Sequence, residues 1–260
     1  MKFGEALLTT SYKEKFTAPS SARNYEQRYA PETADDLLWQ VEQTHLNKVI
    51  SQLREKLTRI DYLDFACGTG RIISFVEPQV DSATGIEISP EMVRIAQKYV
   101  KDASLQCRDI TSEDAEIENK YDLITTYRFI LNAEPALRVA GFKALAARLK
   151  DQSSRLVFSN HGNPWSYKAL MWPVHFGRQL LFGKKREGNY LTRRQTRAVL
   201  DAAGLEIVDV TGVGFISAKI VKLLPFSWCQ KTEATLAGKP LLQRLGVNQL
   251  YVCKLKARSP

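Results

Sequence analysis

Three carboxylates in the first half of the chain stand at nearly even spacing, and each could bind a different part of one ligand. Asp64 lies four residues before Gly68, and Gly70 completes a Gly-x-Gly loop. Glu87 comes 23 residues after Asp64, and Asp109 comes 22 residues after Glu87. A carboxylate beside a glycine loop can pair with a cation, and an acid after the next strand can accept hydrogen bonds from a ribose diol. A third acid can accept one from an exocyclic amine. The spacing therefore predicts a ligand with a cationic end, a ribose and an adenine.

The glycine pattern excludes two phosphate-binding loops. The dinucleotide pattern G-x-G-x-x-G would need a third glycine where Ile73 stands, and G-x-x-x-x-G-K-[ST] is absent. One ligand that carries a cation, a ribose and an adenine is S-adenosylmethionine. The segments DFACGTG, GIEIS, CRDI and YDLITTYRF resemble, in this order, motifs of the class I S-adenosylmethionine-dependent methyltransferases. The resemblance covers roughly residues 60–160.

The resemblance implies a role for each motif residue. Asp64 and the Ala66–Gly70 backbone would hold the methionine end of S-adenosylmethionine, and Glu87 would bind the ribose. Ala66 stands where the family more often has glycine. Two tyrosines, Tyr29 and Tyr127, could close over the cofactor or face it. We expect the cofactor to be bound by Tyr29, Asp64, Ala66, Cys67, Gly68, Gly70, Glu87, Ile88, Met92, Asp109, Ile110 and Tyr127.

Three residues after the later strands are candidates for work on the methyl acceptor. His161 follows the fifth predicted strand and could take a proton from an acceptor oxygen, or it could cap loop backbone groups. Arg128 could hold an acceptor carboxylate or phosphate, or it could pair with Glu134. Asn132 could orient an acceptor hydroxyl, or it could cap the next helix.

Strand and helix signals alternate along the chain. We expect strands within 59–70, 82–88, 104–108, 121–127, 155–160, 205–211 and 250–255, and helices at 34–57, 90–99, 134–149 and 193–203. This order predicts an α/β fold with a doubly wound, seven-stranded, mostly parallel sheet, similar to a Rossmann-like methyltransferase.

Two long insertions and an N-terminal extension accompany this sheet. We expect a helical cap over residues 1–58 and a methyltransferase domain over 59–260. The insertions, 161–192 after strand five and 212–248 after strand six, would form the acceptor side, because the ligand crevice of an open α/β sheet lies beyond the carboxyl ends of its strands.

The composition is that of a globular protein with an uneven basic excess. The 260 residues carry a formal net charge of +9, with 44% hydrophobic and 25% charged residues, which excludes a disordered or collagen-like chain. Residues 161–197 and 212–260 each hold eight basic residues against one glutamate, together with large aromatic residues. Such segments suit an anionic partner, although a solvated basic face would look the same.

The remaining signals concern location and metal. The four cysteines have no C-x-x-C spacing, so we expect reduced thiols and no bound metal. The sequence has no run of about 18 apolar residues, so we expect no membrane-spanning helix and a cytoplasmic protein. The segment FISAKIVKLLPF, residues 215–226, could lie at a membrane interface or form a buried helix.

Together these patterns predict transfer of a methyl group from S-adenosylmethionine to a small acceptor. We expect an oxygen of an anionic, sugar-like or lipid-linked molecule. An RNA methyltransferase that uses the basic insertions is a less favoured alternative, as is a non-catalytic cofactor-binding subunit. The oligomeric state is not predicted.

Overall fold

A seven-stranded sheet runs through the centre of the molecule. The computed structural model describes residues 12, 30–111, 119–167 and 190–257. The strands are β1 (Asp61–Phe65), β2 (Ser82–Glu87), β3 (Ser104–Cys107), β4 (Leu123–Tyr127), β5 (Arg155–Asn160), β6 (Leu205–Val213) and β7 (Asn248–Leu255). Their order is β3-β2-β1-β4-β5-β7-β6, and among these strands β7 alone runs opposite to the other six. The predicted fold class is confirmed.

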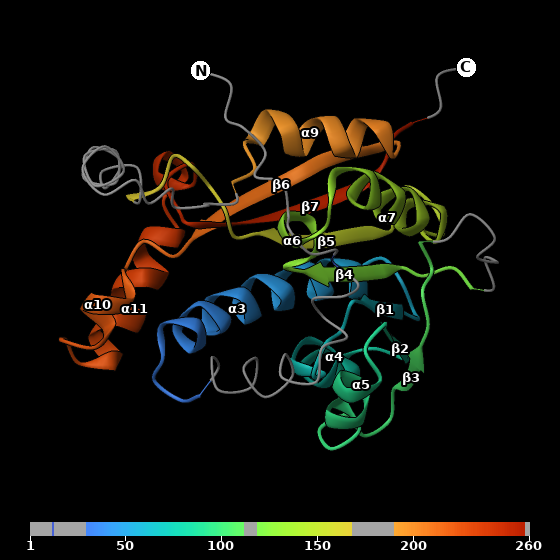
Figure 1. Cartoon of the computed structure of the whole chain (residues 1–260), viewed down its shortest axis with the longest axis horizontal. Helices are drawn as coiled ribbons and strands as arrows, with labels where there is room; N and C mark the ends of the chain where they lie inside the picture. The colour runs from blue at the N-terminus through green and yellow to red at the C-terminus, as the bar shows by residue number, and fades with distance from the viewer. Residues whose placement is uncertain (1–11, 13–29, 112–118, 168–189, 258–260) are drawn as a thin grey trace.

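Helices cover both faces of this sheet (Figure 1). One layer holds α3 (Ala34–Arg54), α4 (Arg71–Val76) and α5 (Pro90–Ala96), and the other holds α6 (Phe129–Asn132), α7 (Pro135–Ala147) and α9 (Arg193–Ala202). Successive strand residues alternate between the two layers, as strand geometry requires. Tyr62 joins the core cluster under α3, whereas Leu63 joins the cluster under α7.

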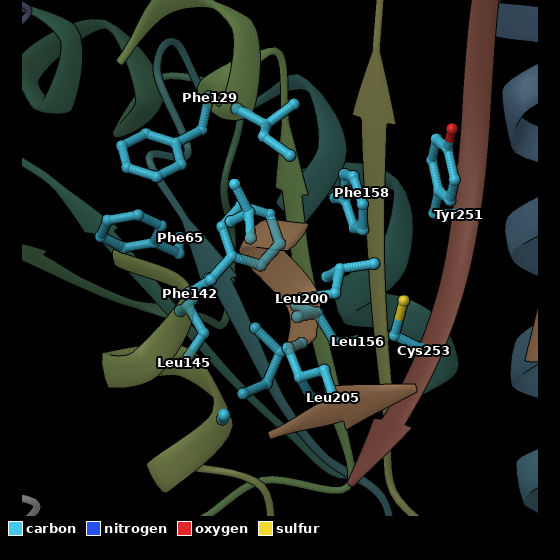
Figure 2. Close-up of a cluster of buried hydrophobic side chains, with 14 of the residues drawn as sticks. Phe65, Phe129, Phe142, Leu145, Leu156, Phe158, Leu200, Leu205, Tyr251 and Cys253 are labelled. Carbon is cyan, nitrogen blue, oxygen red and sulfur yellow. The ribbon is translucent and has the colours of Figure 1, made fainter. Parts of the chain in front are cut away.

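Aromatic rings dominate the core beneath α7 and α9 (Figure 2). Phe158 and Tyr251 stack with ring centroids 4.8 Å apart, and Phe142 meets Phe158 edge-on at 4.9 Å. Such pairs contribute about 0.5–1.5 kcal/mol beyond their burial. They bind α7 to β5 and β7, and so support the part of the sheet from which His161 extends.

Side chains that cap helix N-termini explain where several helices begin. Thr33 accepts a hydrogen bond from the backbone N–H of Asp36 at the start of α3, and Ser89 accepts one from Met92 at the start of α5. Thr192 and Gln195 form a reciprocal capping box at α9. The predicted bounds of these helices and strands were right to within a few residues. Tyr121, expected to open a strand, instead forms an isolated bridge with Leu149.

The segment between β6 and β7 forms two further helices. β6 is two residues longer than predicted, and α10 (Ala218–Val221), α11 (Phe226–Ala237) and a short 3-10 helix (Pro240–Leu242) follow it. Leu37 of α3 packs in one buried cluster with Val221 and Cys229. No helix in the described ranges is long and apolar enough to span a bilayer.

Candidate active site

The loop after β1 is a tight turn at the carboxyl edge of the sheet. Its backbone has a positive φ at Ala66 (56°), Gly68 (57°) and Gly70 (86°). The Cys67 N–H donates to the carbonyl of Ile86 at 3.1 Å, which ties the loop to β2. A Cβ built on Gly70 would lie only 3.0 Å from the Cβ of Ala96, so glycine is required there by both φ and space.

Glu87 at the end of β2 holds this loop in place. Its Oε2 accepts from the backbone N–H of Gly68 at 2.9 Å, and its Oε1 accepts from Ile88 at 2.8 Å and Ser89 at 2.9 Å. The carboxyl is buried, and burial raises its pKa despite these donors. A carboxylate has about four acceptor sites, so Oε2 can accept a further bond from a ribose hydroxyl.

Asp64 on β1 is a buried carboxylate with one unsatisfied oxygen. Its Oδ1 accepts a hydrogen bond from Thr125 Oγ1 at 2.6 Å, and the Tyr62 hydroxyl lies 2.6 Å from the same Thr125 oxygen. Oδ2 is buried and has no hydrogen-bond partner. Desolvation raises the pKa of Asp64 to about 7, although the hydrogen bond from Thr125, the nearby Arg71 guanidinium and a weaker interaction with the Ile73 backbone N–H oppose the shift. A cationic group placed at Oδ2 would satisfy the carboxylate, which fits the α-ammonium group at the methionine end of S-adenosylmethionine.

A pocket lies between the ends of β2 and β3 and the start of α6. The free space within it is about 20 Å³ in this structure. Its lining includes Ala66, Glu87, Ile88 and Asp109, four of the residues predicted from the sequence. The other lining residues are Tyr12, Phe65, Ile86, Arg108, Thr111, Phe129 and Leu137. The pocket is too small to enclose a nucleoside as it stands, but its mostly apolar lining with an acid on each of two sides suits the chemistry of one.

The pocket has a polar side at Asp109 and an aromatic side at Tyr12, Phe65 and Phe129. Asp109 Oδ1 accepts from both the backbone N–H and the hydroxyl of Thr111. Tyr12 meets Phe129 edge-on with ring centroids 5.3 Å apart, and Phe65 also meets Phe129 edge-on at 5.1 Å. A planar base could pack against these rings while its polar edge faces the acid.

The other predicted cofactor residues that the structure describes do not line this pocket: Asp64, Cys67, Gly68, Gly70, Met92, Ile110 and Tyr127. The Cys67, Met92 and Ile110 side chains are buried among apolar neighbours, and burial raises the pKa of the Cys67 thiol well above its usual value. Tyr127 is buried at the end of β4, and its hydroxyl has no hydrogen-bond partner. Tyr29 lies outside the described residues.

The three acceptor-side candidates follow β4 and β5. Arg128 does not pair with Glu134. Its Nη2 donates to Asp35 Oδ1 of α3 at 2.7 Å, and its backbone, with φ of 62°, donates to Ser159 Oγ. Asn132 does not cap α7, because its Nδ2 donates to the carbonyl of Arg128 one turn earlier.

His161 stands directly after β5 at the same sheet edge. β4 and β5 are paired with Tyr127 opposite Ser159, so His161 extends beyond the strand ends beside Arg128. Its side chain is half-buried and its Nδ1 is buried. Among the described residues, no group of His, Cys, Asp and Glu could hold a metal ion.

A polar cluster under α3 was not predicted from the sequence. Glu42 of α3 is buried, and burial raises the pKa of its carboxyl. Arg71 Nη1 lies 3.8 Å from Glu42 Oε2, and its guanidinium lies 4.3 Å from the centre of the Trp39 ring. The available signals were Arg71 directly after the glycine loop and Glu42 in helical register with Leu38 and Leu46. This cluster places a positive charge near Asp64.

Comparison with known proteins agrees with this geometry. A family model described as a methyltransferase domain matches residues 19–210. Over 132 residues the chain is 30% identical to a malonyl-[acyl-carrier protein] O-methyltransferase of Priestia megaterium, covering 47% of this chain and 45% of that protein. A protein of the same name from Acetivibrio thermocellus is 32% identical over 69 residues, covering 26% and 24%. The matches thus span less than half the length of these curated relatives.

Solved structures share the whole fold at low identity. A magnesium protoporphyrin IX methyltransferase from Synechocystis PCC 6803 with bound S-adenosylhomocysteine has a TM-score of 0.58 and 15% identity, covering 94% of this chain and 97% of that one. A methyltransferase from Clostridium acetobutylicum has a TM-score of 0.55 and 16% identity, covering 90% and 99%. At these identities the likeness shows the fold alone.

Proposed function

This chain belongs to the family of S-adenosylmethionine-dependent methyltransferase domains, and on that premise we propose that it methylates an oxygen atom of a small acceptor. The acceptor would be anionic, sugar-like or lipid-linked. The buried Asp64 carboxylate beside the glycine loop held by Glu87 supports the cofactor. The observation that carries the oxygen acceptor is the half-buried His161 at the ends of β4 and β5, a candidate base.

Residues of the pocket and of the glycine loop would each bind a different part of the cofactor. Asp64 would pair with the positive methionine end, Glu87 would accept from the ribose, and Asp109 would meet the adenine edge. When bound, S-adenosylmethionine supplies an electrophilic methyl group on a sulfonium. Positioning two reactants in line can contribute about 7–11 kcal/mol to such a displacement.

The acceptor would lie beyond the ends of β4 and β5. His161 would take the proton from an acceptor hydroxyl, and Arg128 would stabilise an anionic group of the acceptor while Asp35 holds its guanidinium in place. Both curated relatives carry names of O-methyltransferases, which supports oxygen as the acceptor atom. Their named substrate, a malonyl group on a carrier protein, is one anionic acceptor of this kind.

Incubation with methyl-labelled S-adenosylmethionine and cell extract, followed by separation of the products, tests the proposal. Label in small polar solutes, lipids or carrier-linked acyl groups would support it, and alkaline release of labelled methanol would identify a methyl ester. Label in RNA would favour a nucleic-acid substrate instead. Asp64→Asn should abolish transfer, whereas Asp201→Asn, which removes an exposed ion pair with Lys256, should not. Tight cofactor binding without transfer to any fraction would contradict the proposal.

A further inference from the structure

The helical tip formed by residues 218–231, from α10 into α11, exposes large apolar side chains. Leu223 is 81% exposed and Trp228 is 49% exposed, and Ile220 and Leu224 are also exposed. Water contact with such side chains is unfavourable, and covering them with an apolar environment is favourable. Four of them within nine residues form a surface that a partner could cover.

The charge of this tip has a single sign. Lys219, Lys222 and Lys231 are exposed, and no acidic residue occurs between Asp209 and Glu233. Glu233 is buried and does not neutralise them at the surface. Its two carboxylate oxygens accept from the backbone N–H groups of residues 214–216. The tip therefore combines apolar and cationic side chains without an exposed acid.

The inner side of the same tip is anchored to the fold. Val221 and Cys229 are buried against Leu37 of α3, and Gln230 donates a hydrogen bond to Gln40. Packing of α10 and α11 against α3 thus keeps the outward-facing side chains, such as Leu223 and Trp228, exposed to solvent. This arrangement gives the segment one buried face and one exposed apolar, basic face.

The tip lies at the edge of the sheet that carries the candidate site. It follows the carboxyl end of β6, which runs in the same direction as β4 and β5. In Figure 1, the β4 arrow points toward the end of the molecule where α10 and α11 lie. A surface that bound this tip would therefore face the acceptor side.

We propose that the 218–231 tip binds the surface of a membrane that contains anionic lipids. Leu223, Leu224 and Trp228 enter the boundary between headgroups and acyl chains, while the lysines contact lipid phosphates. An indole favours this boundary because one end is apolar and the other can donate a hydrogen bond. Exposed leucines beside lysines can insert into a fluid anionic membrane surface without a preformed cavity, which a protein partner would have to provide.

Vesicle flotation of the full chain without cofactor tests the contact. We expect binding to vesicles of equal parts phosphatidylcholine and phosphatidylglycerol, weak binding to phosphatidylcholine alone, and weaker binding at high salt. The Trp228 emission should shift to shorter wavelength on binding, with Trp228→Phe as the reference for the other tryptophans. Leu223→Ser should weaken partitioning by about tenfold. Lys219→Gln with Lys222→Gln should weaken it by roughly 30-fold.

Matched control changes lie at the other end of the sheet. Tyr99 is 54% exposed and Lys98 is exposed beside it, so Tyr99→Ser and Lys98→Gln remove the same kinds of side chain away from the tip. These controls should bind vesicles as the parent does. Failure of the parent to float with anionic vesicles would overturn the proposal, and it would leave methyl transfer unaffected.

An acidic protein surface is the competing occupant. Polyglutamate serves as its probe, added to the protein alone and in competition with vesicles. If the protein bound polyglutamate as strongly as vesicles, and if Leu223→Ser and Trp228→Phe left both affinities unchanged, charge alone would determine the binding. That result would reject the membrane contact in favour of a soluble polyanion.

Discussion

The pKa of Asp64 leads to a specific pH dependence of cofactor binding. Burial raises this pKa to about 7 from the ordinary 3.8. A cationic ligand at Oδ2 needs the ionised carboxylate, so binding must remove a proton wherever the free protein holds one. Affinity for S-adenosylhomocysteine should therefore fall as pH falls below 7. It should be about tenfold weaker at pH 6 than at pH 8, and about a hundredfold weaker at pH 5.

The same shift has a defined effect on stability. The raised pKa means that the folded state holds this proton more tightly than the unfolded state does between pH 3.8 and about 7. The stabilisation from Asp64 is fully present below pH 3.8 and is lost as pH rises through 7. Cofactor binding at higher pH offsets that loss, so the increase in melting temperature on cofactor addition should grow with pH.

Titration calorimetry in two buffers of different ionisation enthalpy measures the released proton directly. At pH 6 the parent should release about 0.9 proton per bound S-adenosylhomocysteine. Asp64→Asn should bind weakly and lose this dependence, whereas Asp201→Asn should retain it. Circular dichroism at each pH checks that the protein remains folded. An affinity that stays constant from pH 5 to 8, or binding without proton release, would refute the assignment of Asp64 to a cationic group.

Three further changes test the loop, the insertion and the base. Gly70→Ala should lower the free energy of unfolding more than Gly204→Ala does. Both positions have positive φ, which costs a non-glycine residue about 1–2 kcal/mol. At Gly70 the new Cβ would also crowd Ala96, whereas nothing lies within 4 Å of a Cβ at Gly204. Equal losses of unfolding free energy in urea denaturation would contradict this. Glu233→Ala should destabilise by about 3 kcal/mol, because one buried and two partly buried backbone N–H groups lose their acceptor. Glu233→Gln should lose less, and an unchanged unfolding midpoint in Glu233→Ala would count against that role. His161→Ala should lower turnover by about 10²–10⁴ without weakening cofactor binding, and near-normal turnover would remove it as the base.

Local patterns in the sequence were sufficient to predict the sheet. Short apolar, β-rich runs predicted the strands, and Gly68 with Gly70 marked the turn after β1. Because parallel strands end at one edge, acids placed after successive strands had to lie close together. The described pocket brings Glu87 and Asp109 together beside Ala66.

Contacts between distant segments could not be predicted in the same way. The sequence offered Arg128 either an acceptor anion or nearby Glu134 as a partner. In the structure it pairs with Asp35, 93 residues away, because α3 packs across the sheet edge. Tyr12 reaches the pocket through Phe129, and Glu42 reaches Arg71 through the burial of α3. None of these pairs has a spacing that secondary structure dictates.

The sequence by itself therefore determined the order of strands and helices, the glycine turn and the chemical types at the strand ends, since these follow from residue conformation and strand periodicity. Only the tertiary structure decided which atoms remain unsatisfied. Asp64 Oδ2 has no partner while all three donors near Glu87 are taken, because burial and the packing of β1 against β2 and β4 set the distance from each oxygen to a donor.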